Sequence, residues 1–143
     1  MDKKPITPEG YKRLKDELDY IKNIKRQDII DAISEARAHG DLKENAEYHA
    51  AREEQGLNEA RIREIEEALS LSTVIEYKEL GNANIVKFGS LVTILDLDSS
   101  GKKTYQIVGE FEADIDNNTI SITTPIGKAL LKKETGDIVE VDT

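Results

Sequence analysis

The sequence predicts an α+β protein of two domains, an N-terminal antiparallel α-helical coiled-coil hairpin followed by a small antiparallel β domain with one short helix. Three observations support this prediction. Between Tyr11 and Ser70 the chain is highly charged, and its apolar residues recur at helical spacing. The dipeptide His39-Gly40 interrupts this segment near its middle. Short runs of β-branched residues follow Ser70, so we place the domains at residues 1–75 and 76–143.

Composition and charge narrow the possible classes of function. The 143-residue chain is 38% hydrophobic and 34% charged, with a net charge of −9 and no cysteine. Both halves are acidic, which argues against free duplex DNA as the main ligand because phosphate binding needs a surplus of Lys and Arg. Residues 1–5 lack the apolar core of a signal peptide, and no apolar run reaches membrane-spanning length. We therefore expect a soluble, cytoplasmic, monomeric protein without disulfides and without membrane contact.

The first arm of the hairpin is predicted to be one helix from Pro8 to His39. Thr7 suits the N-cap, Pro8 the first helical position, and Glu9 the positive end of the helix dipole. No glycine or proline interrupts residues 11–39. Roughly 30 helical residues at about 1.5 Å each give an arm of about 45 Å.

The apolar seam of this arm begins in coiled-coil register and then shifts. Its first part follows a 3-4-3 spacing: Tyr11, Leu14, Leu18 and Ile21. Lys25 and Asp28 occupy the next strict heptad positions. A second apolar face continues toward the break: Ile29, Ile30, Ile33 and Ala36. The pattern thus predicts one continuous helix whose register drifts.

The break itself is predicted to be a sharp turn between two antiparallel helices. Gly40 favours the left-handed conformation that closes a helix. Asp41 suits the next N-cap, and Glu44 falls at its N3 position, which is the spacing of a capping box. From this spacing alone a structural cap is favoured over a chemical role, although the two roles can coexist. Either way, two carboxylates lie at the tip of the arm.

The return helix is expected to run from Asp41 to about Ser70. Small residues in its tip half let two helices approach closely: Ala46, Ala50 and Ala51. Apolar residues with 3-4 spacing follow in its base half: Ile62, Ile65 and Leu69. On the surface, Glu59 and Arg63 are spaced for an i,i+4 ion pair. Taken alone, the hairpin is a solvated two-helix arm.

The second domain is predicted to contain short strands separated by turns. The expected strands are residues 74–77, 91–95, 104–108, 119–123 and 138–141. Asp98–Gly101 and Asp116–Asn118 are the expected turns between consecutive strands, and Pro125 opens a short helix over residues 126–132. Strands joined by such turns favour a small antiparallel sheet.

The longest specific motif is ARAHGDLKENAEYHAARE, residues 36–53. It resembles the bacterial Gre transcript cleavage factors, and is closer to their GreA type than to GreB. The resemblance continues through the second domain and covers nearly the whole chain: Phe88-Gly89, 105–109, Ala113-Asp114, Ile120-Ser121 and 124–130. It implies a C-terminal domain similar to the FK506-binding-protein fold. The family usually continues past the position of Thr143 with a Gly-containing turn and a further strand, which is absent here.

The resemblance implies a transcription elongation factor that acts inside bacterial RNA polymerase. The hairpin would enter the secondary channel and stimulate the polymerase's own cleavage of the backtracked nascent RNA 3′ end, so that elongation resumes. Asp41 and Glu44 would be the catalytic pair and would share Mg²⁺ with the polymerase. The chemistry is consistent, because two-metal phosphodiester hydrolysis uses carboxylate ligands and an exposed pair alone holds Mg²⁺ weakly. No stand-alone nuclease is expected, and DNA contact would occur only weakly, through the polymerase complex.

The resemblance suggests roles for further residues, and simpler explanations exist for them. Arg37 and Arg52 flank the tip and would contact RNA phosphates, or else lie on a solvated helix face. Tyr48 and Asn45 would support the tip, with bracing favoured over base stacking for Tyr48. The corner Thr124-Pro125-Ile126 would dock on the polymerase rim, or else form a plain helix N-terminus.

The same residues bear on three rival functions. A channel-binding polymerase inhibitor on this scaffold stays open, although the intact pair Asp41 and Glu44 counts against it. A coiled-coil adaptor or chaperone would favour an apolar tip rather than a charged one. A peptidyl-prolyl isomerase ranks last, since the second domain supplies few aromatic residues for a proline pocket. His39 and His49 lack a third ligand at suitable spacing, so we reject a structural zinc site.

Overall fold

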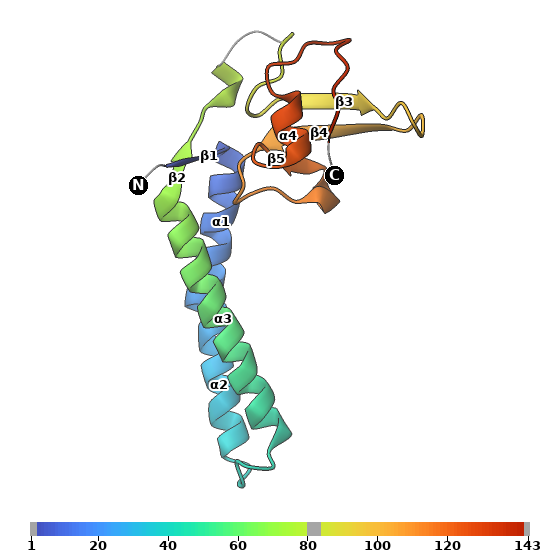
Figure 1. The fold of residues 1–143 in the computed structure, drawn as a ribbon. Helices are drawn as coiled ribbons and strands as arrows, with labels where there is room; N and C mark the ends of the chain where they lie inside the picture. The colour runs from blue at the N-terminus through green and yellow to red at the C-terminus, as the bar shows by residue number, and fades with distance from the viewer. Residues whose placement is uncertain (1–2, 80–83, 142–143) are drawn as a thin grey trace. The chain divides into compact units, whose positions relative to one another are not determined.

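The computed structural model describes residues 3–79 and 84–141, and its contacts divide the chain into two compact units. One unit is Lys12–Ser70, and the other joins Met1–Tyr11 to Leu71–Thr143. This grouping differs from the predicted division at residue 75, because the start of the chain belongs with the second unit. There β1 (Lys4–Ile6) pairs in parallel with β2 (Ser72–Val74) (Figure 1). No helix among the described residues is long and apolar enough to span a bilayer.

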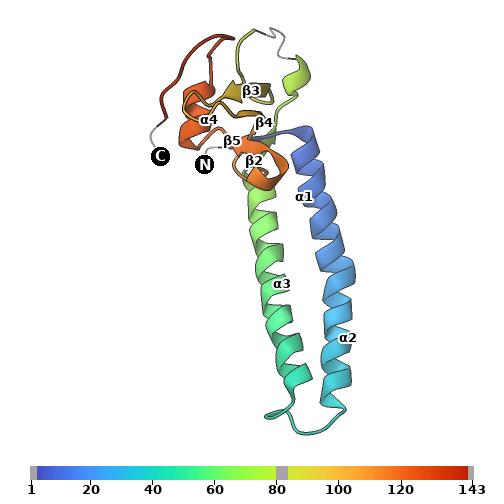
Figure 2. The same cartoon turned by 90° about the vertical axis from the view of Figure 1, so that its right-hand side faces the viewer.

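The Lys12–Ser70 unit is an antiparallel helical hairpin, as the sequence predicts. Its first arm consists of α1 (Pro8–Tyr20), a π-helical turn at Ile21–Lys25 and α2 (Arg26–Arg37). Its second arm is one helix, α3 (Ala46–Leu71), which runs beside the first arm (Figure 2). The prediction of an unbroken α-helix from Pro8 to His39 is therefore wrong at the π-turn and at the last residues.

The π-turn explains why the apolar seam shifts. Leu14 is buried before the turn and Ile21 at its first residue, and Ile29 and Ala36 are buried after it. Successive buried residues are therefore seven, eight and seven positions apart. A π-turn closes through an i→i+5 bond and so takes up one residue more than an α-turn. On α3 the matching buried residues keep an unbroken seven-residue spacing: Ala51, Asn58 and Ile65.

The second unit contains a three-stranded sheet in the order β3-β4-β5. β3 (Leu91–Leu95) and β4 (Lys102–Val108) form the predicted antiparallel hairpin. β5 (Thr119–Ser121) pairs with β4 in parallel, so the prediction of a fully antiparallel sheet is wrong here. Parallel strands need a crossover rather than a tight turn. The chain makes this crossover over residues 109–118, which include a 3₁₀ turn at Ile115–Asn117.

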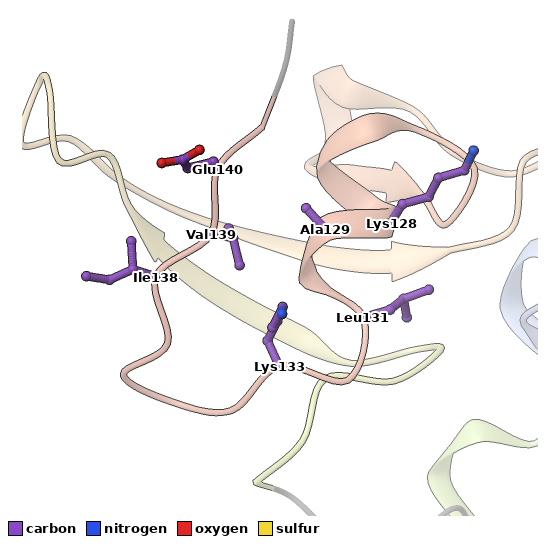
Figure 3. Close-up of a pocket in the computed structure, with 7 residues that line it drawn as sticks. All are labelled: Lys128, Ala129, Leu131, Lys133, Ile138, Val139 and Glu140. Atoms are coloured by element: carbon purple, nitrogen blue, oxygen red, sulfur yellow. The ribbon is translucent and has the colours of Figure 1, made fainter.

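A short helix, α4 (Pro125–Leu130), packs against the sheet through a small core. The buried centre of this core is Ile107, Ile120 and Leu130. The predicted strand at residues 138–141 is not formed, although Val139 packs against the core. An isolated bridge instead joins Ile85 to Glu134. Figure 3 shows the segment 138–140 passing α4, with which it lines a pocket instead of joining a strand.

A buried carboxylate anchors the start of α1 within the second unit. Thr7 is the N-cap, as predicted, and its Oγ1 accepts a hydrogen bond from Gly10 N at 3.0 Å. The carboxylate of Glu112 accepts from Thr7 N at 2.8 Å, from Gly109 N at 2.9 Å and from Thr7 Oγ1. A Cβ atom at Gly10 would overlap this carboxylate, so the close approach requires glycine.

Candidate functional site at the hairpin tip

A loop over residues 38–45 joins α2 to α3 and carries the two tip carboxylates. α2 ends at Arg37, and Gly40 follows with a φ of 110°. Gly40 N donates to Arg37 O at 3.3 Å, which closes the last turn of the helix. Glycine adopts this left-handed conformation without the penalty that a side chain brings, as expected from the sequence.

The return helix starts later than predicted, and its N-cap is Asn45. The Oδ1 atom of Asn45 accepts from Tyr48 N at 3.0 Å, which is the N3 position of α3. Its Nδ2 atom donates to Ala36 O at 2.6 Å, near the end of α2. One amide side chain therefore satisfies backbone groups of both helices, whereas an aspartate can only accept. The predicted capping box of Asp41 and Glu44 is wrong for this reason.

The two carboxylates of the tip contribute little to holding the loop. Asp41 Oδ1 accepts from Lys43 N at 3.0 Å, a local turn of a kind that aspartate commonly forms. The Glu44 carboxylate makes no hydrogen bond or ion pair with the residues that the structure describes. Both side chains are exposed. Their free oxygen lone pairs fit a hard cation such as Mg²⁺, provided that further ligands come from another molecule.

The described residues do not provide those further ligands. Within residues 3–79 and 84–141, no three His, Cys, Asp or Glu side chains come together as a metal site. Two carboxylates on an exposed loop are a partial coordination shell, since Mg²⁺ requires an octahedral set of oxygens.

Basic and aromatic side chains lie on the helix ends that flank the tip loop. Arg37 ends α2 and Arg52 lies in the second turn of α3, and both are exposed. The ring of Tyr48 meets the ring of His49 edge-on with centroids 5.5 Å apart. His49 Nε2 lies 3.0 Å from Lys43 O and so braces the loop. The sequence suggested no such role for His49, because a ring-to-backbone contact leaves no spacing signal.

The predicted docking corner belongs to the second unit, at the start of α4. Thr124 Oγ1 accepts from Gly127 N at 3.2 Å and donates to Ser121 O at 2.7 Å, so Thr124 is the N-cap. Pro125 is exposed, whereas Ile126 packs against the core of the sheet. The structure accounts for all three residues as a helix start, and a polymerase contact of this corner stays a prediction.

Interhelical ion pairs link the two arms of the hairpin. They are Glu17–Arg61 at 2.7 Å, Arg26–Glu59 at 2.8 Å and Lys22–Glu66 at 2.9 Å. Hydrogen bonding to the Arg61 guanidinium lowers the pKa of Glu17, and Arg26 lowers the pKa of Glu59 in the same way. Glu59 thus bonds across the hairpin to Arg26, and not to Arg63 on its own helix.

Comparisons with known proteins assign the whole chain to one family. Residues 4–74 match the family model for the N-terminal domain of transcription elongation factors, and residues 81–143 match the model for the GreA/GreB C-terminal domain. Transcription elongation factor GreA from Francisella tularensis subsp. novicida (strain U112) is 54% identical over 142 residues, covering 99% of this chain and 89% of the relative. GreA from Francisella tularensis subsp. tularensis (strain SCHU S4 / Schu 4) has the same identity and coverage.

A solved structure supports the same assignment. The transcription factor Gfh1 is 29% identical to this chain, with a TM-score of 0.51, over 100% of this chain and 91% of that chain. Family membership thus rests on matches over both units and on a fold of the same kind. The chain belongs to the GreA/GreB family of transcription elongation factors.

Proposed function

We propose that this protein stimulates transcript cleavage by bacterial RNA polymerase. The hairpin enters the secondary channel of a backtracked polymerase and brings Asp41 and Glu44 to the displaced RNA 3′ end. Membership of the elongation-factor family supports the partner. The observation that carries the proposal is the exposed acidic pair at the tip, whose carboxylates are not committed to capping either helix.

The length and width of the hairpin suit entry into a deep channel. α3 spans Ala46–Leu71, which at about 1.5 Å per residue is about 39 Å of helix. A two-helix arm is narrow, and interhelical ion pairs link its two helices. It can therefore carry two carboxylates far from the base of the hairpin.

The acidic pair would act as ligands within a site that the polymerase completes. Mg²⁺, when bound there, supplies Lewis acidity and lowers the pKa of a bound water. Asp41 and Glu44 supply hard, negatively charged oxygens that hold and orient such a group. Arg37 and Arg52 place two guanidinium groups near the tip, where they would neutralise RNA phosphates. The protein alone should be inert as a nuclease, because two ligands on an exposed loop do not build a complete site.

The decisive experiment compares naked RNA with a backtracked elongation complex. We expect the protein with Mg²⁺ to leave naked RNA intact and to shorten the transcript in the stalled complex. Asp41→Asn and Glu44→Gln should lower stimulated cleavage by orders of magnitude and still compete with the parent protein for polymerase. Cleavage of free RNA would make the protein a nuclease. Inhibition without cleavage by the parent would favour the channel-blocking alternative.

A further inference from the structure

Two adjacent residues of α3 hold the π-turn of the first arm. Asn58 is only 4% exposed, and its Nδ2 donates to Ile21 O at 2.9 Å. Glu59 accepts from Nε and from one terminal nitrogen of Arg26, at 2.8 Å each. Arg26 closes the turn, because its backbone N–H donates to Ile21 O. Ile21, the first residue of the turn, and Arg26, which follows its last residue, are therefore both bound to the same turn of α3.

A buried amide in this position needs an explanation. Asn58 lies seven residues from Ala51 and seven from Ile65, in the apolar seam of α3. In coiled coils, a single buried polar residue lowers stability but specifies register. Here its partner is a carbonyl group at the one place where the facing helix takes up an extra residue. The buried amide of Asn58 therefore lies opposite the π-turn of the first arm.

The π-turn determines which face of α2 meets α3. One residue more or less rotates the following helix by about 100°. Ile29 and Ala36 are 4% and 2% exposed, so the turn must stay in place for them to face α3. Ala36 also holds the tip loop, since its carbonyl accepts the Nδ2 hydrogen bond of Asn45. A rotation of α2 would thus break the contact that closes the tip.

We propose that Asn58 and Glu59 are positioning residues for the acidic tip. By clamping the π-turn they fix the rotation of α2, and through Ala36 and Asn45 they fix the loop that carries Asp41 and Glu44. This inference rests on the proposed function where it concerns cleavage. The placement of α2 relative to α3 is a property of the free protein and can be measured without polymerase.

The test uses spin labels, which cysteine substitution places selectively because the chain has no cysteine. One pair, at Ser34 and Glu54, reports the distal hairpin. The other pair, at Asp19 and Arg63, reports the base side of the π-turn. We expect Asn58→Leu to broaden or shift the distance distribution of the distal pair and to leave the base pair unchanged. Glu59→Gln should act in the same direction. Glu17→Gln removes an interhelical charge pair outside the turn and should leave the distal distances unchanged.

A compensating deletion separates positioning from general stability. Asn23 is an exposed residue of the π-turn, and its deletion restores seven-residue spacing along the seam of the first arm. In that regular helix Asn58 has no π-turn to bind. Asn58→Leu should therefore lower the stimulated cleavage of the parent chain but raise that of the chain that lacks Asn23. In the parent we expect cleavage to fall by about tenfold or more while the melting temperature holds or rises, since catalysis is sensitive to small misplacements.

The outcomes separate the two proposals. Distances that change as stated, while the parent fails to stimulate cleavage, would support the clamp and reject the proposed function. Unchanged distal distances in Asn58→Leu would overturn the clamp, whatever the cleavage assay shows. Equal effects of Asn58→Leu on stimulated cleavage with and without Asn23 would also overturn the clamp. A residue that only adds stability would act in the same way whether or not the π-turn is present.

Discussion

Removing the buried carboxylate of Glu112 should destabilise the second unit strongly. This side chain is 7% exposed and accepts three hydrogen bonds, two from Thr7 and one from Gly109. Glu112→Ala leaves all three donors without this acceptor. Thr7 is also the N-cap of α1, so the same change loosens the point at which the helix starts.

The magnitude follows from the number of donors. A hydrogen bond to a charged group contributes about 1.5–3 kcal/mol, and a buried group left unpaired costs about 1–3 kcal/mol. The three terms do not add fully, because water enters the space that the side chain leaves. We therefore expect Glu112→Ala to lower the free energy of unfolding by about 3–5 kcal/mol. Glu112→Gln keeps one acceptor oxygen, so its loss of unfolding free energy should lie between those of the parent and Glu112→Ala.

A neighbouring glutamate provides the matched control. Glu110 pairs with Lys4 at 2.6 Å, but the two side chains are 33% and 46% exposed. Solvent-exposed pairs of this kind contribute about 0–1 kcal/mol. Urea unfolding of the full chain, with amide exchange of β4 as the probe of the second unit, compares the two variants. Equal losses for Glu110→Ala and Glu112→Ala would refute the reasoning, because burial would then make no difference.

Three further outcomes are expected. Asn45→Ala should cost about 1 kcal/mol of hairpin stability through loss of the N-cap, whereas Asp41→Ala should cost less than about 0.5 kcal/mol, as urea unfolding followed at 222 nm can show. The pKa of Glu17 is lowered in the fold, so its stabilising contribution is present above the ordinary value of 4.5 and is lost as pH falls through the lowered one. Glu17→Gln should therefore flatten the acid limb of a melting-temperature profile. The hydrogen bond to Glu9 raises the pKa of Tyr77 above 10.0. The resulting contribution to stability is present below pH 10.0 and is lost as the pH rises through the raised pKa. Glu9→Gln should move the ultraviolet titration of this tyrosine back toward 10.0.

Local patterns predicted the parts of the fold that depend on neighbouring residues. The hairpin follows from helical spacing on both sides of Gly40, and the β3–β4 pair follows from two β-branched runs around a short turn. The π-turn could not be predicted in the same way. Lys25 and Asp28 reveal that the seam shifts, but a helix can absorb one residue locally or spread it over several turns. The choice depends on Asn58, which lies 37 positions away from Ile21.

The second unit was less predictable because its pairings are not local. The run at 119–123 has the pattern of a strand, and a preceding turn favours a hairpin. The crossover at 109–118 reverses this expectation by returning the chain alongside β4 in the same direction. It includes Glu112, whose carboxylate accepts from Gly109 N and from Thr7 N. Thr7 is about a hundred residues away, so no local pattern reveals this contact.

The position of the cap changes how the two tip carboxylates should be understood. Asp41, Glu44 and Asn45 all precede α3, and aspartate and asparagine are equally good caps. The amide also donates to Ala36 O, which a carboxylate cannot do. With the cap at Asn45, the carboxylates gain only a local turn bond. Because the fold draws little stability from them, replacing them should leave the hairpin intact while removing ligands for a cation. A variant that folds and binds polymerase but does not stimulate cleavage is the expected consequence.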